Sequence, residues 1–362
     1  MRPLITRRMV IAGGLALLAT PAWASRAAAM PQSPLRIGVV ADLTGPLSRM
    51  GKQIQTGIGT RAEALGGGHG GMSMFELLMA DKAADERAAV AGLLEQGVHA
   101  LAGSGEAVAE AGNTSCTPTL LFDGTASGPF VFQAGPSAAQ VSRAQLAAVK
   151  QAGLTKAGQL SAAPADPESF AAHGLTFTGA QLIPLDAAGL APQAQAVADE
   201  EPEAVIVNAP PPLEALAVKD LRTAGFAGPI FCSPSATDPG FQAAAGEAAA
   251  EGVKAVSPWL PAVAEAPENL PHQPMMKRFA DGYLMAHGRP GAHAGYAADA
   301  LSLLHLAYLG HRDRKQAQAQ LEQMCCIGVT GVYNMTPSKH DGLDPAALTT
   351  LVSNAGVWKA NT

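Results

Sequence analysis

The stretch Leu35–Gly59, LRIGVVADLTGPLSRMGKQIQTGIG, combines an apolar run, a tight turn and the start of a helix. The run is typical of a parallel strand that has helices over both of its faces. Its apolar members are Leu35, Ile37, Val39 and Val40. We therefore expect this stretch to contain the first strand of an α/β domain.

The turn after this run is a candidate ligand-binding loop. It contains Gly45 and Pro46, and it carries polar side chains at Asp42, Thr44 and Ser48. Open α/β sheets bind ligands at the carboxyl ends of their strands, where this loop is expected to lie. An ordinary strand-to-helix connection stays open as the alternative.

The residues ahead of this strand resemble an export signal. Arg2, Arg7 and Arg8 precede the apolar stretch Met9–Thr20, and Ala22-Trp23-Ala24 fits the small-residue pattern of a cleavage site. We expect cleavage before Ser25, a soluble product in the periplasm, and either general or twin-arginine export.

Composition narrows the class of protein. The 362 residues have a net charge of −6, with 15% charged and 5% aromatic residues. This balance argues against nucleic acid or an anionic membrane as partner. The four cysteines, Cys116, Cys232, Cys325 and Cys326, have neither disulfide-framework nor zinc spacing, so we expect mostly buried free thiols.

Strand and helix patterns alternate along the chain, which predicts parallel sheets built from βαβ units. Two such series are followed by further helices, so the lobes are expected to be assembled from discontinuous segments. The strands are expected at 75–80, 98–102, 119–122, 130–133, 157–161, 180–184, 204–208, 229–232, 332–335 and 356–359. The helices are expected at 86–96, 137–152, 168–173, 191–200, 212–224, 275–287, 297–309 and 315–324.

Seven short motifs, in order, resemble the type I periplasmic binding proteins, specifically the branched-chain amino-acid (leucine/isoleucine/valine) binding subfamily of ABC importers. They are the opening 37–58, Ala64-Leu65-Gly66-Gly67, the strand to Asp81, Val98–Gly103, Ala250-Glu251-Gly252-Val253, Gly295–Ala300 and the closing segment from Gly331 to Gly342. The resemblance covers nearly the whole mature chain.

The resemblance implies an α/β fold of two doubly wound, Rossmann-like lobes joined by three hinge crossings. It implies an export signal at 1–24, a linker at 25–34, a first lobe at 35–136 plus 262–328, and a second lobe at 137–261 plus 329–362. The crossings are expected near 134–138, 257–261 and 327–332. Such lobes close over a small-molecule ligand, and the closed form is recognised by a membrane permease. A monomer without cofactor or metal is expected.

The family's pocket maps onto loops of both lobes. On the first lobe the resemblance points to Met50, to Ser104-Gly105-Glu106 as the loop that receives a substrate carboxylate, and to Thr125-Ala126-Ser127. On the second lobe it points to Phe170, Asn208-Ala209-Pro210 and Ser233-Pro234-Ser235, and Tyr296 is placed at the opening of the penultimate helix.

Two departures alter the expected ligand. Ser235 stands where the family has an acidic partner for the substrate ammonium, and Asp238 is the nearest substitute. Glu106 brings a negative charge to the carboxylate loop; its alternative role is to stabilise the helix that follows. Both departures favour a ligand other than a typical branched-chain amino acid, such as an amide, a urea-like solute, an alcohol, an acid, a small aromatic or a lipid.

Two other classes of function stay open. One is a solute or lipid receptor that delivers to a non-importer membrane system or sensor. The other is a redox enzyme using Cys325 and Cys326, although no nucleophile elbow, phosphate loop or histidine metal motif is present in the sequence. We therefore expect a receptor rather than an enzyme.

Overall fold

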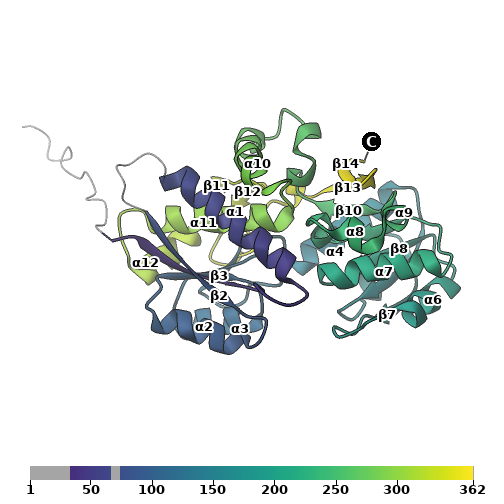
Figure 1. Ribbon diagram of the computed structural model, residues 1–362, viewed down its shortest axis with the longest axis horizontal. Coiled ribbons are helices and arrows are strands. Elements are labelled where there is room, and N and C mark those ends of the chain that lie inside the picture. The colour runs from purple at the N-terminus through teal and green to yellow at the C-terminus, as the bar shows by residue number, and fades with distance from the viewer. Residues whose placement is uncertain (1–32, 67–73, 362) are drawn as a thin grey trace, which may run out of the picture.

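The computed structural model describes residues 33–66 and 74–361, which form two α/β lobes lying side by side (Figure 1). The predicted export signal, most of the linker and most of the glycine-rich segment after α1 lie outside the described residues. No described helix has the length and apolar character needed to cross a membrane.

The first lobe is built on a parallel sheet of five described strands in the order β2-β1-β3-β4-β5. The strands are β1 (Leu35–Ala41), β2 (Phe75–Asp81), β3 (Ala100–Gly103), β4 (Thr119–Leu121) and β5 (Val131–Gln133). The fold predicted from the first strand is therefore confirmed.

Helices cover both faces of this sheet, which explains the continuous apolar run of β1. Ile37 and Val39 pack in a core with α1 and α11, whereas Val40 packs in a second core with α2 and α3. The helices of this lobe are α1 (Ser48–Gly66), α2 (Glu86–Glu95), α3 (Glu106–Thr114), α10 (Gln273–His287), α11 (Ala292–Ala307) and α12 (Arg314–Leu321). The hairpin β11 (Cys325–Ile327) and β12 (Val332–Asn334) completes the lobe.

Two glycines of the opening motif permit close backbone contacts. A Cβ at Gly51 would clash with the carbonyl of Asp42, and one at Gly57 would clash with the carbonyl of Ala294. Gly51 therefore lets the first turn of α1 lie against the end of β1. Gly57 lets α1 pack directly against α11, a segment more than 200 residues away in the sequence.

The second lobe contains a mixed sheet of seven described strands, in the order β14-β13-β10-β9-β8-β6-β7. The neighbouring pairs β7–β6, β6–β8, β8–β9 and β9–β10 are parallel, and β13 pairs antiparallel with both β10 and β14. The strands are β6 (Lys156–Ser161), β7 (Thr176–Leu182), β8 (Ala204–Asn208), β9 (Ile230–Cys232), β10 (Lys254–Ser257), β13 (Thr349–Asn354) and β14 (Val357–Ala360).

Helices again pack on both faces, with α4 and α5 on one and α6, α7 and α8 on the other. They are α4 (Ala138–Gln151), α5 (Pro167–Ala172), α6 (Ala191–Asp199), α7 (Pro211–Thr223), α8 (Phe241–Ala245) and α9 (Glu247–Ala250). Short 3-10 turns are η1 (Pro234–Thr237), η2 (Leu260–Glu265) and η3 (Pro345–Ala347).

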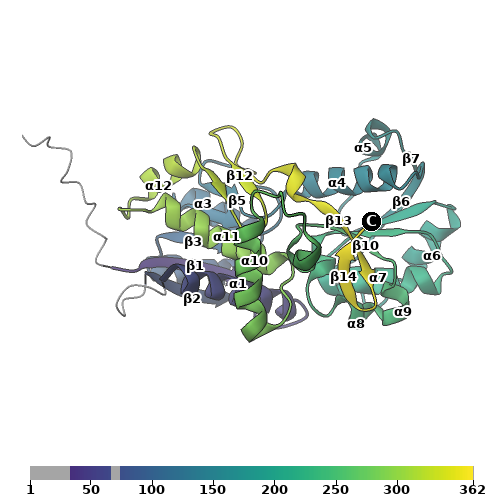
Figure 2. The same ribbon diagram turned by 90° about the horizontal axis from the view of Figure 1, so that it is seen from above.

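The described chain passes between the two sheets three times, after β5, after β10 and between β12 and β13 (Figure 2). The residues 327–332, expected to form the third crossing, lie within the β11–β12 hairpin. Tyr333 of this hairpin is fully buried in the first lobe's core. Asp299 of α11 fixes the hairpin loop, because its carboxylate accepts hydrogen bonds from the backbone of Val329 (2.5 Å) and Thr330 (2.9 Å).

The cysteines are free, but the expectation of mostly buried thiols is wrong. Cys232 is buried, Cys326 is half-buried, and Cys116 and Cys325 are exposed. Cys325 is exposed because it lies in the short β11–β12 ribbon and not within either large sheet.

Candidate functional site

A cleft of about 740 Å³ lies between the lobes and is lined from both sides. The first lobe contributes the loops after β2, β3 and β4 and the first turns of α1 and α11. The second lobe contributes the loops after β6, β8 and β9, together with α4 and α5. Parallel strands of one sheet end at the same edge, which brings these loops together and makes the cleft a candidate small-molecule site.

Most of the residues predicted from sequence line this cleft. Those from the first lobe are Met50, Ser104, Gly105 and Tyr296, and those from the second are Phe170, Asn208, Ala209, Pro210, Ser233 and Ser235. Their role in ligand binding stays a prediction.

Glu106 and the loop Thr125–Ser127 do not line the cleft. Glu106 is exposed at the first position of α3, where a carboxylate is favourable. The 125–127 loop is held against α3, because Asn113 donates to the carbonyl of Ser127 (2.7 Å) and accepts from the amide of Phe130 (3.1 Å).

The N-terminus of α3, predicted to receive a substrate carboxylate, is occupied by an internal one. Glu86 Oε1 accepts a hydrogen bond from the backbone N–H of Val108 at 3.2 Å. The same carboxylate lies against Gly105, where any Cβ would clash with it. This helix end is thus already neutralised from within the first lobe.

A buried histidine at the start of α11 joins the two lobes. His293 Nδ1 lies 2.6 Å from Asp238 Oδ2, and its Nε2 lies 3.8 Å from Asp123 Oδ2. Thr237 Oγ1 also accepts from the backbone N–H of Ala292 at 3.3 Å. Thr237 and Asp238 follow β9 in the second lobe, so these contacts tie that lobe to the first turn of α11.

The electrostatics of this cluster favour charged side chains. Burial by itself lowers the pKa of His293, but the charge of Asp238, supported by Asp123, outweighs burial and raises the pKa to about 10. Burial opposes ionisation of Asp123, yet its interaction with His293 prevails and lowers the pKa of that carboxyl. His293 is therefore a cation between two carboxylates at neutral pH.

Lys82 is the other basic side chain that the first lobe contributes to the cleft lining. Its Nζ donates to the carbonyl of Ser104 at 2.9 Å and lies 3.6 Å from Asp42 Oδ2. The Ser104 loop is held in place by this contact.

The loop after β9 is held from below by a buried acid. Glu214 of α7 accepts from the backbone N–H of Ser233 at 2.7 Å and from its hydroxyl at 3.2 Å. Ser235 Oγ lies 2.8 Å from Ser233 Oγ. Burial raises the pKa of the Glu214 carboxyl well above its ordinary value. Through its hydrogen bonds to Ser233, this carboxyl supports the loop from beneath the cleft surface.

Two buried hydroxyls of the first lobe remain available. The hydroxyl of Tyr296 has no hydrogen-bond partner within residues 33–66 and 74–361, and Ser104 Oγ has none at close hydrogen-bond geometry, although it helps to lower the pKa of the Asp123 carboxyl. Both residues line the cleft and are at most 4% exposed. A buried polar atom without a partner is costly, so both are candidates for ligand contacts.

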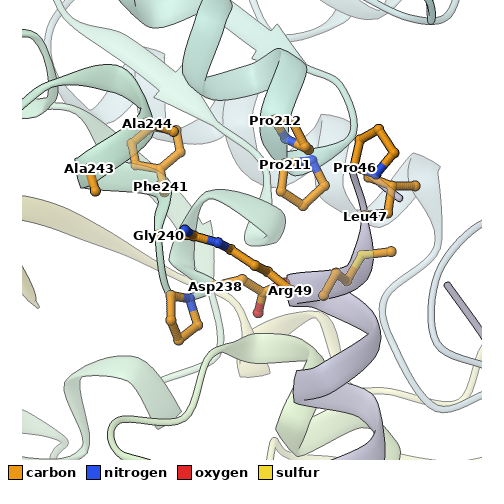
Figure 3. A pocket seen from close by; sticks show the side chains of 12 residues that line it. Pro46, Leu47, Arg49, Pro211, Pro212, Asp238, Gly240, Phe241, Ala243 and Ala244 are labelled. Atoms are coloured by element: carbon orange, nitrogen blue, oxygen red, sulfur yellow. The ribbon is translucent and has the colours of Figure 1, made fainter. Parts of the chain in front are cut away.

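A smaller pocket of about 290 Å³ adjoins the cleft, and Leu47, Met50 and Pro211 line both (Figure 3). Arg49 extends from the first turn of α1 toward Gly240 of the second lobe. Gly240 has a φ of 102°, and a Cβ there would clash with the Arg49 guanidinium. Gly240 therefore permits an inter-lobe contact beside the His293 cluster.

Five charged cleft residues were absent from the sequence prediction: Lys82, Asp123, Arg143, Asp166 and His293. Lys82 directly follows β2 and Asp123 lies two residues after β4, positions that could have identified them. Arg143 lies within a regular helix, where no sequence signal separates it from a solvated arginine. His293 was missed because α11 begins at Ala292, five residues before the predicted start.

Comparisons with known proteins agree with this architecture. The sequence profile of the family described as periplasmic binding protein matches residues 34–356. No curated protein sequence matches the chain.

Within the part of the chain that the structure describes, no group of three or more histidine, cysteine or acidic side chains is arranged to hold a metal ion.

Several solved structures share the fold at low sequence identity. Rp1789 of Rhodopseudomonas palustris (strain CGA009) superimposes with a TM-score of 0.80 at 18% identity, covering 91% of this chain and 100% of that one. The leucine binding protein LivK of Thermotoga maritima gives 0.73 at 19% identity, covering 91% and 98%. A solute binding protein of an ABC transporter from R. palustris, in complex with benzoate, gives 0.72 at 19% identity, covering 90% and 95%.

Proposed function

The chain belongs to the periplasmic binding protein family, and we propose that it is the solute-binding protein of an ABC-type importer. The observation that carries the proposal is the cleft, which is lined by strand-end loops of both lobes. A solute that contacts both lobes stabilises their closed arrangement, and the permease recognises that arrangement. The family is one of solute receptors, and we assign no catalytic activity to the chain.

We further propose that the solute is not a typical branched-chain amino acid. Ser235 carries no charge and its hydroxyl is 2.8 Å from that of Ser233. Asp238, the nearest acid along the chain, is only 3% exposed and is paired with His293. Among the described residues, the acid nearest to Ser235 along the chain is thus not free to pair with an α-ammonium group. The structural relatives include both a leucine binding protein and a benzoate complex, so the fold accommodates different solutes.

The lobes are proposed to comprise residues 35–136 with 262–343, and 137–261 with 348–361. These ranges move the lobe boundary expected at 328/329 and set the third crossing near η3; the pairing of β12 with β11 and the packing of Tyr333 in the first core support them. The mature protein is proposed to begin at Ser25 and to act as a periplasmic monomer.

A thermal-shift screen of residues 25–362 against amino acids, amides, ureas, alcohols, aromatic acids and lipids tests the proposal. A solute at 100 times its Kd stabilises the folded protein by about 2.7 kcal/mol. Stabilisation by any compound outside the branched-chain amino acids supports both the importer assignment and the proposed ligand class. Stabilisation by leucine, isoleucine or valine alone contradicts the proposed ligand class, and no stabilisation by any compound contradicts the importer assignment and favours delivery to a sensor or another membrane system.

A further inference from the structure

We propose that the cleft takes a solute with two charged ends, a cationic end held by Asp123 of the first lobe and an anionic end held by Arg143 of the second. The proposal rests on the function proposed above and specifies the substrate class of the same cleft. It follows from the charges that remain after the internal pairs of the cleft are assigned.

The first lobe side of the cleft has one carboxylate in excess. Lys82 lies beside Asp42, and His293 pairs with Asp238 at 2.6 Å. Asp123 makes the longer 3.8 Å approach to His293, whose other nitrogen is already engaged, and it also interacts with the charge of Lys82 and the Ser104 hydroxyl, without a close ion pair of its own. Its side chain is 46% exposed and lines the cleft, so it is accessible to a solute. A carboxylate in this position favours a cationic, hydrogen-bond-donating group.

The described residues of the first lobe offer no corresponding site for an anion. The N-terminus of α3 is occupied by Glu86, which accepts from the Val108 amide. Lys82 Nζ is engaged by the Ser104 carbonyl and lies near Asp42. A solute carboxylate placed here would be repelled by Asp123. It would also have to displace the Glu86 contact with Val108 or the Lys82 contact with Ser104.

The second lobe contributes a cation that has no ion-pair partner among the described residues. Arg143 of α4 is exposed and is the basic side chain that this lobe contributes to the described cleft lining. No described carboxylate lies within ion-pairing distance of its guanidinium, in contrast to Arg87, which pairs with Glu110 at 2.7 Å. A free guanidinium binds a carboxylate through two parallel hydrogen bonds.

Asp166, the acid of the second lobe that lines the cleft, is already occupied. It caps α5, where its carboxylate accepts from the Ser169 hydroxyl at 2.5 Å and from the amides of Glu168 and Ser169. These hydrogen bonds, the Ser169 hydroxyl foremost, lower the pKa of Asp166. Its oxygens already serve the helix start, which leaves Arg143 as the cation of this wall that has neither an ion-pair partner nor a hydrogen bond among the described residues.

The walls between the two ends are largely apolar. Leu47, Met50 and Phe122 line the cleft from the first lobe, and Val141 and Phe170 line it from the second. The Ser104 and Tyr296 hydroxyls lie on the Asp123 side, within the first lobe. A solute with an aliphatic or aromatic middle and charged ends fits this distribution, and because its ends contact different lobes, both contacts are complete only when the lobes are closed.

The test uses residues 25–362 and matched probes. The two-ended probes are 5-aminopentanoate and 4-(aminomethyl)benzoate; the one-ended probes are pentanoate, pentylamine, 4-methylbenzoate and 4-methylbenzylamine. Leucine and the neutral amides of the two acid-only probes, pentanoate and 4-methylbenzoate, complete the panel. Thermal shifts identify binders, and calorimetry gives Kd for the wild type, Asp123→Asn and Arg143→Gln. Glu95→Gln and Lys219→Gln, at exposed helix positions, control for the change in charge.

A two-ended probe is expected to bind more tightly than either one-ended analogue. Loss of a charge-assisted contact predicts a roughly 10- to 100-fold weaker Kd in each cleft variant and no change in the controls. Asp123→Asn should leave binding of the acid-only probes unchanged, and Arg143→Gln should leave binding of the amine-only probes unchanged.

Other outcomes separate this inference from the function on which it rests. If one-ended or neutral compounds bind and two-ended compounds do not, the inference is wrong and the receptor assignment stands. A two-ended probe whose Kd is unchanged in both cleft variants also overturns the inference. If nothing in the panel or in the wider screen binds, both the inference and the importer assignment are contradicted.

Discussion

Replacing His293 by leucine should destabilise the protein far more than replacing another equally buried histidine. His293 is 3% exposed and paired with Asp238, which is also 3% exposed. Removing one partner of a buried ion pair leaves an uncompensated charge and costs about 3–5 kcal/mol. The rise of the pKa of His293 from 6.5 to about 10 corresponds to about 5 kcal/mol, in agreement with that range.

His272 provides the matched control. It is also 3% exposed, but neither of its ring nitrogens has a partner among the described residues. Burial lowers the pKa of His272, so the ring is neutral at pH 7. His272→Leu removes an unsatisfied polar group and should change the free energy of unfolding by no more than about 1 kcal/mol.

The pH dependence gives the same prediction a second readout. The pKa of His293 is raised above its unfolded value of 6.5, so its contribution is complete below pH 6.5 and is lost as the pH rises toward about 10. Urea unfolding of the wild type and both variants at pH 6.5, 8 and 10.5 measures the effect. The cost of His293→Leu should shrink across this series. A cost below about 1 kcal/mol at pH 6.5, or one that does not change with pH, would refute the reasoning.

Three further changes test other parts of the structure. Gly57→Ala should cost about 1–3 kcal/mol of unfolding free energy, because the new Cβ would clash with the α11 backbone. Gly59 lies in the same helix with open space around it, so Gly59→Ala should be neutral or slightly stabilising. Circular-dichroism melts compare the two variants. Glu214→Gln should cost less than about 1 kcal/mol because an amide oxygen still accepts from the Ser233 amide, and Glu214→Leu about 1–3 kcal/mol; equal costs for the two would contradict this role. A maleimide should label the exposed Cys325 within minutes and leave Cys232 unmodified, since burial raises the pKa of the Cys232 thiol; fast labelling of Cys232 in the native protein would show that its core opens.

The fold could be predicted from local patterns because its parallel strands are nearly continuous apolar runs. Leu35–Ala41 is buried on both faces, so its residues carry the signal that identifies such strands. The strands that sequence reasoning missed lack such a continuous apolar run. Thr349–Asn354 is a half-buried antiparallel strand, and Lys254–Ser257 is short and adjoins a proline-rich segment. Their pairing with each other, about 95 residues apart, depends on tertiary contacts.

The candidate site could be predicted only where a loop follows a recognisable strand end. Asn208 and Ser233 were found in this way. His293 was not, because its position depends on where α11 begins, and helix ends are the least certain feature of a sequence pattern. Glu86 occupies the α3 N-terminus from a different helix, so recognising that this helix end already holds a carboxylate required knowledge of the packing between α2 and α3.

The measurement that tests the central claim most directly is the ligand-induced thermal shift of a variant whose cleft is filled. Ala209 lines the cleft after β8, so Ala209→Trp should occupy the space of the solute, whereas Lys219→Trp lies on the exposed side of α7. With the most stabilising compound of the screen, the shift should be lost in Ala209→Trp and kept in Lys219→Trp. An unchanged shift in Ala209→Trp would contradict binding between the lobes.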